Sequence, residues 1–451
     1  MQIIYDNAKP FDKLLKKQRI KDGEQYRPMY YVVEQPVDEG LLLYHTMTKA
    51  LVLLTPEEAD IYKTNPAALP QLIEQWFLVP SSHDDRLLSR QIKDVAKMLK
   101  KETNAITSYT ILTTTDCNAR CFYCYEMGRP RVPMNKETAL KTADYIINHC
   151  QGKKVSLHWF GGEPLYNKTV ITLICKRLQE ACIDYSSMMI SNGYLLDDDI
   201  IREAKDLWLL NKVQITLDGT EKIYNRSKAY IYKGVNAYER VIGNIHRLQK
   251  VGIHVNIRLN IDMHNADNLI ELVDELHKEF TDTKGISVYL HALFEEIKGS
   301  QALKNDVKRK YVFSKMNEIE SQLKEFGLLK PHRLNRDIKI NHCMADKDSS
   351  IVIVPSGYIG KCEHYSEDHF VGHIESDDWD RQMMESFRLT RKEISACSAC
   401  FDYPNCIWLK LCEDHPNCYQ EERDHQLVKL HGSIMRAFQK YKDKQEDEIQ
   451  D

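Results

Sequence analysis

The chain has 451 residues, of which 62 are basic and 66 acidic, and its formal net charge is -4. Because both signs are mixed along the sequence, it offers no extended basic surface, and we expect no nucleic-acid partner. No apolar run reaches the roughly 18 to 20 residues of a membrane span, and the N-terminus has no signal-peptide core. We therefore expect a cytoplasmic protein of two or three units that does not bind a membrane.

The first unit is predicted over residues 1–104. Residues 29–34 and 40–54 have the pattern of short strands in a hairpin meander, and a helix is expected to begin at Pro56. Residues 44–50 would form the turn or the edge of this hairpin.

The second unit is predicted over residues 105–330, where β-rich runs alternate with helical patterns. The expected strands are residues 108–115, 154–160, 187–191, 212–217, 254–261 and 285–291, and the expected helices include residues 136–149, 238–250 and 268–280. This pattern predicts an α/β fold, a partial (β/α)6, TIM-like barrel that stays open because eight units are needed to close one.

The C-terminal region is predicted to contain little regular structure. Residues 351–354 and 358–361 should form a hairpin, and residues 331–425 are otherwise rich in cysteine, proline and aspartate. Metal ligation commonly replaces a core in such a segment. The last helix is expected over about residues 426–442, followed by a solvated tail to residue 451.

Thirteen cysteines in a chain without an export signal point to metal binding, because the cytosol keeps thiols reduced. Cys150, Cys175 and Cys182 are scattered on predicted helices, and we expect them to be packing residues. Three more lie at residues 117–124 and seven at residues 343–418.

The first group, Cys117-x-x-x-Cys121-x-x-Cys124, directly follows the first strand of the barrel pattern, at the end where such folds keep their active sites. Three thiolates can hold three corners of an iron–sulfur cubane and leave the fourth iron open. The alternative is a zinc site with a fourth ligand such as His149.

With Tyr123 before its last cysteine, this motif resembles that of the radical S-adenosylmethionine (radical SAM) superfamily, whose open iron binds S-adenosylmethionine and whose product is a 5′-deoxyadenosyl radical. Further family-like elements follow at successive strand ends. The resemblance implies that the cofactor is bound by Tyr123, Gly161, Gly162, Glu163, Ser191, Asn192, Thr216, Asp218, Lys228, Arg258 and Asn260. Lys228 departs from the family, which commonly has an arginine there to pair with the carboxylate; a lysine supplies the charge without the fork.

The second group resembles the SPASM extension of radical SAM enzymes, which binds two auxiliary clusters. The resemblance implies that Cys343, Cys362 and Cys412 ligate one and that Cys397, Cys400, Cys406 and Cys418 ligate the other, giving three 4Fe-4S clusters in all. The spacings around Cys412 and Cys418 differ from the family pattern, and a pair of zinc ribbons is the alternative. Seven cysteines leave one auxiliary position open, or bound by His342 or a substrate thiolate.

The N-terminal pattern resembles the winged-helix-like leader-recognition element of ribosomal peptide maturases, although a purely structural cap is the alternative. Together the resemblances imply a peptide maturase that abstracts a hydrogen from a precursor peptide with a leader and closes a crosslink, most often a thioether. An external donor such as flavodoxin or ferredoxin would reduce it.

Two rivals stay open. A sulfatase-maturing, formylglycine-generating enzyme would place a catalytic aspartate after the cysteine matching Cys362, where this chain has Glu363. A non-enzymatic adaptor with zinc in the cysteine-rich tail is the rival of another class.

Overall fold

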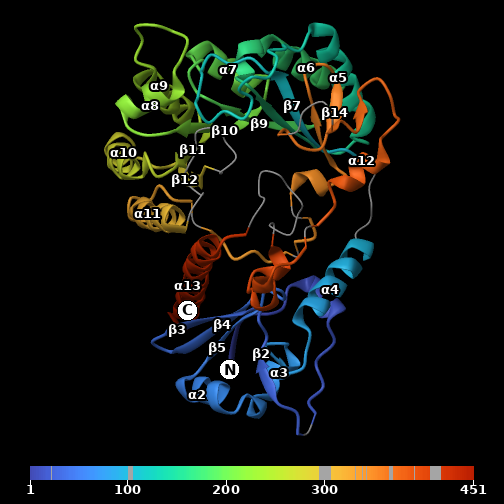
Figure 1. Ribbon diagram of the computed structural model, residues 1–451, viewed down its shortest axis with the longest axis vertical. Coiled ribbons are helices and arrows are strands. Elements are labelled where there is room, and N and C mark those ends of the chain that lie inside the picture. The colour runs from blue at the N-terminus through green and yellow to red at the C-terminus, as the bar shows by residue number, and fades with distance from the viewer. Residues whose placement is uncertain are drawn as a thin grey trace.

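The computed structural model describes residues 1–21, 23–99, 105–293, 306–330, 332–337, 339–341, 343–364, 369–390, 392–406 and 418–450. An α/β unit built on a parallel sheet lies at one end, and the N-terminal unit lies at the other (Figure 1). The cysteine-rich segment, drawn in orange, runs from the parallel sheet to the N-terminal unit. Among the described residues no helix is both long and apolar enough to cross a membrane.

Six parallel strands follow one another in chain order across the sheet, as the sequence predicted. They are β7 (Ser108–Thr114), β8 (Val155–Gly161), β9 (Tyr185–Ser191), β10 (Leu210–Leu217), β11 (His254–Ile261) and β12 (Ile286–Ala292). Each agrees with its expected range to within a residue or two. The connecting helices are α5 (Lys136–His149), α6 (Lys168–Glu180), α7 (Asp198–Asp206), α8 (Glu221–Lys228), α9 (Ala237–Lys250) and α10 (Ala266–Glu279), and α11 (Asp306–Glu325) follows β12.

The alternating pattern predicted these elements because each helix buries one apolar face against the sheet. Cys150 and Cys175 are fully buried in this core, as expected for packing residues. The same expectation is wrong for Cys182, which is exposed and has a left-handed backbone (φ 56) just after α6. A residue in that turn cannot point into the core that α6 covers.

The cysteine-rich unit continues the same sheet. The predicted hairpin is present as β13 (Ser350–Ile353) and β14 (Tyr358–Gly360), with β15 (Gly372–His373) beside it. β13 pairs in parallel with β7, so the expected division near residue 330 does not divide the sheet. The remaining short elements of this unit are η3 (Met344–Asp346), α12 (Arg381–Ser386), η5 (Ser395–Ala399) and η6 (Tyr403–Asn405).

The N-terminal unit contains an antiparallel sheet in the order β1-β5-β4-β3. Its strands are β1 (Gln2–Tyr5), β3 (Val32–Val37), β4 (Gly40–His45) and β5 (Leu51–Leu54), and β2 (Tyr26–Pro28) pairs separately with β6 (Leu78–Pro80). Its helices are α1 (Lys9–Leu14), α2 (Pro56–Thr64), η1 (Pro66–Ala68), α3 (Pro70–Glu74) and α4 (Asp85–Leu99). The expected strand over residues 29–34 is wrong in its bounds, because a turn at residues 30–31 separates β2 from β3.

The helix beginning at Pro56 is confirmed, and a capping box sets its start. The Thr55 side chain accepts a hydrogen bond from the Glu58 backbone N–H, and the Glu58 carboxylate accepts one from the Thr55 N–H. This reciprocal arrangement satisfies two N–H groups that a helix start would leave unpaired.

The apolar run in residues 41–54 is explained by burial on both faces of the sheet. Leu41 and Leu43 pack toward α2 and α3, whereas Leu42 and Tyr44 pack against the last helix, α13 (Gln420–Gln450). That helix is longer than expected, since the charged residues after Lys442 continue it rather than forming a frayed tail. Lysine, glutamate and glutamine are strong helix formers, which accounts for the extension.

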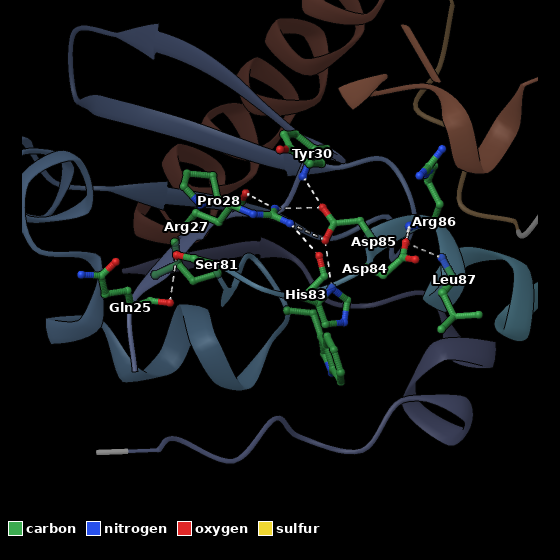
Figure 2. Close-up of polar contacts among 12 residues, drawn as sticks. Gln25, Arg27, Pro28, Tyr30, Ser81, His83, Asp84, Asp85, Arg86 and Leu87 are labelled. Atoms are coloured by element: carbon green, nitrogen blue, oxygen red, sulfur yellow. Dashed lines mark hydrogen bonds and ion pairs between the residues drawn. The ribbon is translucent and has the colours of Figure 1, made fainter. Parts of the chain in front are cut away.

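The start of α4 is fixed by a buried carboxylate, shown in Figure 2. Asp85 accepts hydrogen bonds from the Arg27 guanidinium, from the Tyr30 backbone N–H at 2.8 Å and from the His83 ring at 2.9 Å. Burial alone would raise the pKa of Asp85, but the hydrogen bonds from His83, Arg27 and Tyr30 lower it below its usual value. A negative charge at this end also suits the helix dipole.

Candidate active site

The cysteine loop leaves β7 at the carboxyl edge of the parallel sheet. Cys117, Cys121 and Cys124 are each partly buried, and burial raises the pKa of all three thiols, for Cys117 to about 12. The three thiols also influence one another electrostatically, which places them around one small volume. Cys117 Sγ accepts hydrogen bonds from the Ala119 N–H at 3.3 Å and from the Asn192 amide at 3.7 Å.

These thiols fit an iron–sulfur cubane. In a cubane each thiolate binds a different iron, so the sulfurs need to surround a volume but not to converge on one point. Among the described residues, no three His, Cys, Asp or Glu side chains are grouped closely enough to hold a single metal ion. Desolvated thiols that accept N–H···S bonds are the donor set that such a cluster requires.

Glu163 is fully buried beside this loop, at the end of β8. Its carboxylate accepts two hydrogen bonds from the Ser191 hydroxyl, at 2.9 and 3.1 Å, and one from the Asn192 backbone N–H at 2.9 Å. Burial raises the pKa of Glu163 to about 7. The Leu165 backbone N–H also donates to Glu163 Oε1, at 3.2 Å. A carboxylate offers about four acceptor positions and these three donors occupy three of them, so one position is left for a cationic amino group.

The two glycines before Glu163 allow the strand to pass against the cysteine loop. A Cβ on Gly161, where φ is +123, would lie 2.1 Å from the Thr114 carbonyl oxygen. A Cβ on Gly162 would lie 2.3 Å from the Asp116 carbonyl oxygen. Backbone hydrogen bonds of 2.9 Å from Gly162 to Thr114 and from Glu163 to Asp116 close this contact. The glycines therefore position the buried carboxylate next to the thiols.

Lys228 forms a buried ion pair. Its Nζ lies 3.0 Å from Asp218 Oδ2, and the two side chains are only 4% and 3% exposed. The ammonium also donates to the Tyr123 hydroxyl at 2.6 Å, which in turn donates to Asp218 Oδ2 at 2.6 Å. Burial alone would lower the pKa of Lys228, but the Asp218 carboxylate raises it well above its usual value.

This ion pair ties the cysteine loop to the fourth strand of the parallel sheet. The Arg120 backbone N–H donates to the Lys228 carbonyl at 2.8 Å, so the residue contacts the loop through its main chain as well. The resemblance implied that Lys228 contacts the cofactor carboxylate; in the structure its ammonium is paired with Asp218, and a cofactor contact stays a prediction.

The remaining predicted cofactor residues lie next to this ion pair. Asn260 donates to Asp218 Oδ1 at 3.3 Å and accepts from Arg258 Nε at 2.8 Å. Thr216 is paired in register with Arg258 between β10 and β11. The structure therefore places these residues on adjacent parallel strands that end at the cysteine loop.

The second group of cysteines is partly assembled. Cys400 and Cys418 influence each other electrostatically, as do Cys418 and Cys397, and burial raises the pKa of Cys400 to about 11. Arg423 Nη1 donates to Cys418 Sγ at 3.1 Å. Cys406 is buried, whereas Cys343 is exposed and Cys362 partly buried. Cys412 and His342 lie outside the described residues.

Two residues that sequence reasoning missed lie between the two groups. Tyr125 stacks on the His364 ring with centroids 4.5 Å apart, and its buried hydroxyl has no hydrogen-bond partner among the described residues. Glu126 is 9% exposed, its Oε1 has no hydrogen-bond partner in the described part of the chain, and burial raises its pKa to about 7. The buried Oε2 of Glu363 also has no partner among these residues, and Glu363 acts electrostatically on Tyr125 and His158. Their position directly after Cys124, the last cysteine of the loop, is the sequence feature that could have indicated that Tyr125 and Glu126 belong to the site.

Residues 111–295 match the sequence profile of the Radical SAM superfamily. Over 201 residues the chain is 28% identical to an uncharacterized protein of Methanocaldococcus jannaschii, covering 44% of this chain and 60% of that protein. It is 30% identical over 162 residues to the probable GTP 3',8-cyclase of Pyrococcus horikoshii, covering 34% of this chain and 46% of that protein. The chain thus spans only part of the curated relatives it matches.

Solved structures share the fold over more of the chain. The structure of anSMEcpe with bound AdoMet and Cp18Cys peptide aligns with 75% of this chain and 99% of its own, at 15% identity and a TM-score of 0.55. Streptococcus suis SuiB bound to S-adenosylmethionine aligns with 84% of this chain and 94% of its own, at 14% identity and a TM-score of 0.50. At these identities the likeness concerns the fold, and it agrees with the profile: residues 111–295 of this chain are a radical SAM superfamily domain.

Proposed function

We propose that this protein is a radical SAM peptide maturase that cleaves S-adenosylmethionine and closes an intramolecular crosslink, a thioether, in a ribosomally made precursor peptide. One observation carries the proposal: at one edge of the parallel sheet, Asn192 links Glu163 to the cysteine loop at Cys117, and Tyr123 links the Asp218–Lys228 pair to the same loop. A 4Fe-4S cluster with S-adenosylmethionine bound there supplies hydrogen-atom abstraction from an unactivated carbon.

The protein's own groups have distinct roles in this proposal. Cys117, Cys121 and Cys124 hold the cluster, and Glu163 accepts hydrogen bonds from the amino group of S-adenosylmethionine. Its contacts with Ser191, Asn192 and Leu165 fix the orientation of the carboxylate. Asp218 and Lys228 hold Tyr123, which lies between two of the cluster cysteines, and so limit movement of the loop.

A peptide substrate is supported by the N-terminal unit. Its strand β3 pairs only with β4 among the described strands, so the other edge of β3 presents backbone groups that a leader could pair with as an added strand. We assign this unit a winged-helix-like leader-recognition role. The anSMEcpe structure with a bound Cp18Cys peptide lends support to a peptide as substrate.

The C-terminal cysteines are proposed to hold two auxiliary 4Fe-4S clusters in a SPASM-type unit, one with Cys343, Cys362 and Cys412 and the other with Cys397, Cys400, Cys406 and Cys418. The proximity of Cys397, Cys400 and Cys418 supports the second set. An external flavodoxin or ferredoxin would supply electrons in the cytoplasm.

A second candidate is formylglycine formation in a sulfatase-type protein. The buried, unpaired Oε2 of Glu363 favours it, because a carboxylate held without a partner can accept a substrate proton. The mass of the product separates the two candidates, since formylglycine formation from cysteine removes the sulfur from the substrate, whereas thioether closure retains it.

The test of the proposal is anaerobic incubation with S-adenosylmethionine, dithionite and the peptide encoded beside this gene, followed by mass spectrometry. The expected result is 5′-deoxyadenosine together with a peptide that is two hydrogen atoms lighter. A reconstituted protein that stays colourless and zinc-loaded would overturn the proposal and favour a metal-binding adaptor.

A further inference from the structure

We propose that Lys49, Lys93 and Lys339 form a cationic wall beside the auxiliary iron–sulfur cluster that includes Cys406, and that this wall raises the reduction potential of that cluster. The inference rests on the proposed SPASM-type unit and deepens it. It assigns the N-terminal unit a part in the redox chemistry, because two of the three lysines belong to that unit.

Lys49 is held at this place by the turn between β4 and β5. Its side chain is 2% exposed, and Nζ donates to the Thr46 carbonyl at 2.6 Å and to Asn405 Oδ1 at 2.7 Å. Asn405 directly precedes Cys406 and returns a hydrogen bond to the Thr46 carbonyl at 3.2 Å. These hydrogen bonds attach the N-terminal turn to the Asn405 side chain, next to the predicted cluster ligand Cys406.

The backbone of Lys49 has an unusual conformation at this turn. Its φ is 67, in the left-handed region that glycine and asparagine occupy most easily. Backbone strain of this kind persists only where the surrounding structure holds it in place, as the Lys49 hydrogen bonds do here.

Lys93 and Lys339 reach the same place from other elements. Together with Lys49 and Asn405 they line one small cavity between the N-terminal unit and the cysteine-rich segment. Lys93 lies on α4, which is anchored to the cysteine-rich unit by ion pairs from Arg86 and Arg90 to Glu393. Cys406 is the largest charged influence on Lys93, and it also acts on Lys339.

The three ammonium groups lie near one another and share one carboxylate. Asp402 acts on all three lysines, whereas Asp337 acts more weakly on Lys49 and Asp346 more weakly on Lys339. Burial lowers the pKa of Lys49 and of Lys93 to about 8, which leaves both mostly protonated at neutral pH. Buried like charges are unfavourable without an anionic partner. A cluster held by thiolates carries net negative charge and would supply that partner.

Positive charge near a cluster stabilises the more negative, reduced form. The potential of an iron–sulfur cluster is set in part by nearby charge and by solvent exposure. The N-terminal unit also covers Cys397 and Cys400 with apolar side chains. It therefore affects both the charge near this cluster and the exposure of the cluster to solvent. An enzyme that passes an electron through its auxiliary cluster would depend on that potential.

The test is an anaerobic redox titration of the full-length, reconstituted protein, followed by electron paramagnetic resonance. Lys93→Met should lower the midpoint of one auxiliary signal, with a reduced-to-oxidised ratio about tenfold smaller at a fixed potential, or about 59 mV. Lys97→Met is the matched control, since Lys97 is exposed on the same helix, and it should leave the midpoint unchanged. Lys93→Arg, which keeps the positive charge, should also leave the midpoint unchanged.

The outcomes separate this inference from the proposed function. An unchanged midpoint in Lys93→Met at full iron content overturns the inference. Loss of one cluster in Lys93→Met but not in Lys93→Arg supports it, whereas loss in both shows that packing rather than charge matters and overturns it. Wild-type protein that cleaves S-adenosylmethionine but has no auxiliary signal overturns this inference and the SPASM-type unit while leaving the radical SAM site intact.

Discussion

The buried pair of Asp218 and Lys228 should couple the stability of the sheet to the cysteine loop. We compare Lys228→Met and Asp218→Asn with the double variant. Removing one partner of a buried ion pair typically costs about 3–5 kcal/mol, whereas replacing both can be nearly neutral. After Lys228→Met, Asp218 still accepts from Tyr123 at 2.6 Å and from Asn260 at 3.3 Å, so this variant should lie near the lower value. After Asp218→Asn, Lys228 lacks its counter-charge, so the loss of unfolding free energy should lie near the upper value of this range.

The assay is anaerobic thermal unfolding of the three variants. For a unit of about 200 residues, 1 kcal/mol corresponds to about 2–4 °C, so the single variants should unfold about 6 °C or more below the wild type. The double variant should recover part of this loss, with a coupling energy of about 2–3 kcal/mol. Strictly additive losses would refute the reasoning, because they would mean that Lys228 and Asp218 do not interact.

Three further predictions concern single residues. Glu163→Gln should weaken binding of S-adenosylmethionine by about tenfold to a hundredfold, since a hydrogen bond to a charged group contributes about 1.5–3 kcal/mol. The affinity of the wild type, measured by calorimetry, should fall below pH 7, because the raised pKa of Glu163 leaves the carboxyl protonated there. The affinity of the variant should not depend on pH in this way. Gly162→Ala should reduce iron loading of the loop, because its Cβ would lie 2.3 Å from the Asp116 carbonyl oxygen. Gly243→Ala, in α9, should leave the iron content unchanged, because its Cβ would make only an ordinary contact of 3.8 Å with the Arg247 guanidinium. Thr55→Ala should lower the unfolding free energy in urea by about 1 kcal/mol through loss of the capping box, and an unchanged value would contradict that role.

Much of the parallel sheet could be predicted because its signals are local. Each strand is a short buried run followed by an amphipathic helix, and the functional motifs stand at strand ends, where parallel topology brings them together. Glu163, Ser191 and Asn192 lie far apart in sequence, yet their contact follows from two adjacent strands. The α5 bounds were predicted to the residue, since Asn135 caps the helix with its side chain.

Contacts between units were not predictable in the same way. The pairing of β13 with β7 joins residues from both ends of the chain, and no local pattern distinguishes it from an isolated hairpin. The buried pairing of Lys228 with Asp218 was likewise not predicted, because a sequence motif does not reveal which carboxylate an ammonium meets. Residues 44–50 were expected to form the turn or edge of a hairpin, and residues 46–50 do form the turn between β4 and β5. The burial of Thr46, Thr48 and Lys49 in this turn was not predicted.

This burial determines how leader recognition can be tested. Thr46 donates to the Phe401 carbonyl at 2.5 Å, and Tyr31 stacks on Tyr403 with centroids 6.2 Å apart, so the N-terminal unit contributes directly to the surroundings of the auxiliary cysteines. Deleting that unit would expose these residues and remove Lys49 as well as any leader site. Loss of activity in a truncated protein would therefore not identify leader binding. Substitutions confined to the outer edge of β3, which leave the covered face intact, isolate the peptide contact from the cluster environment.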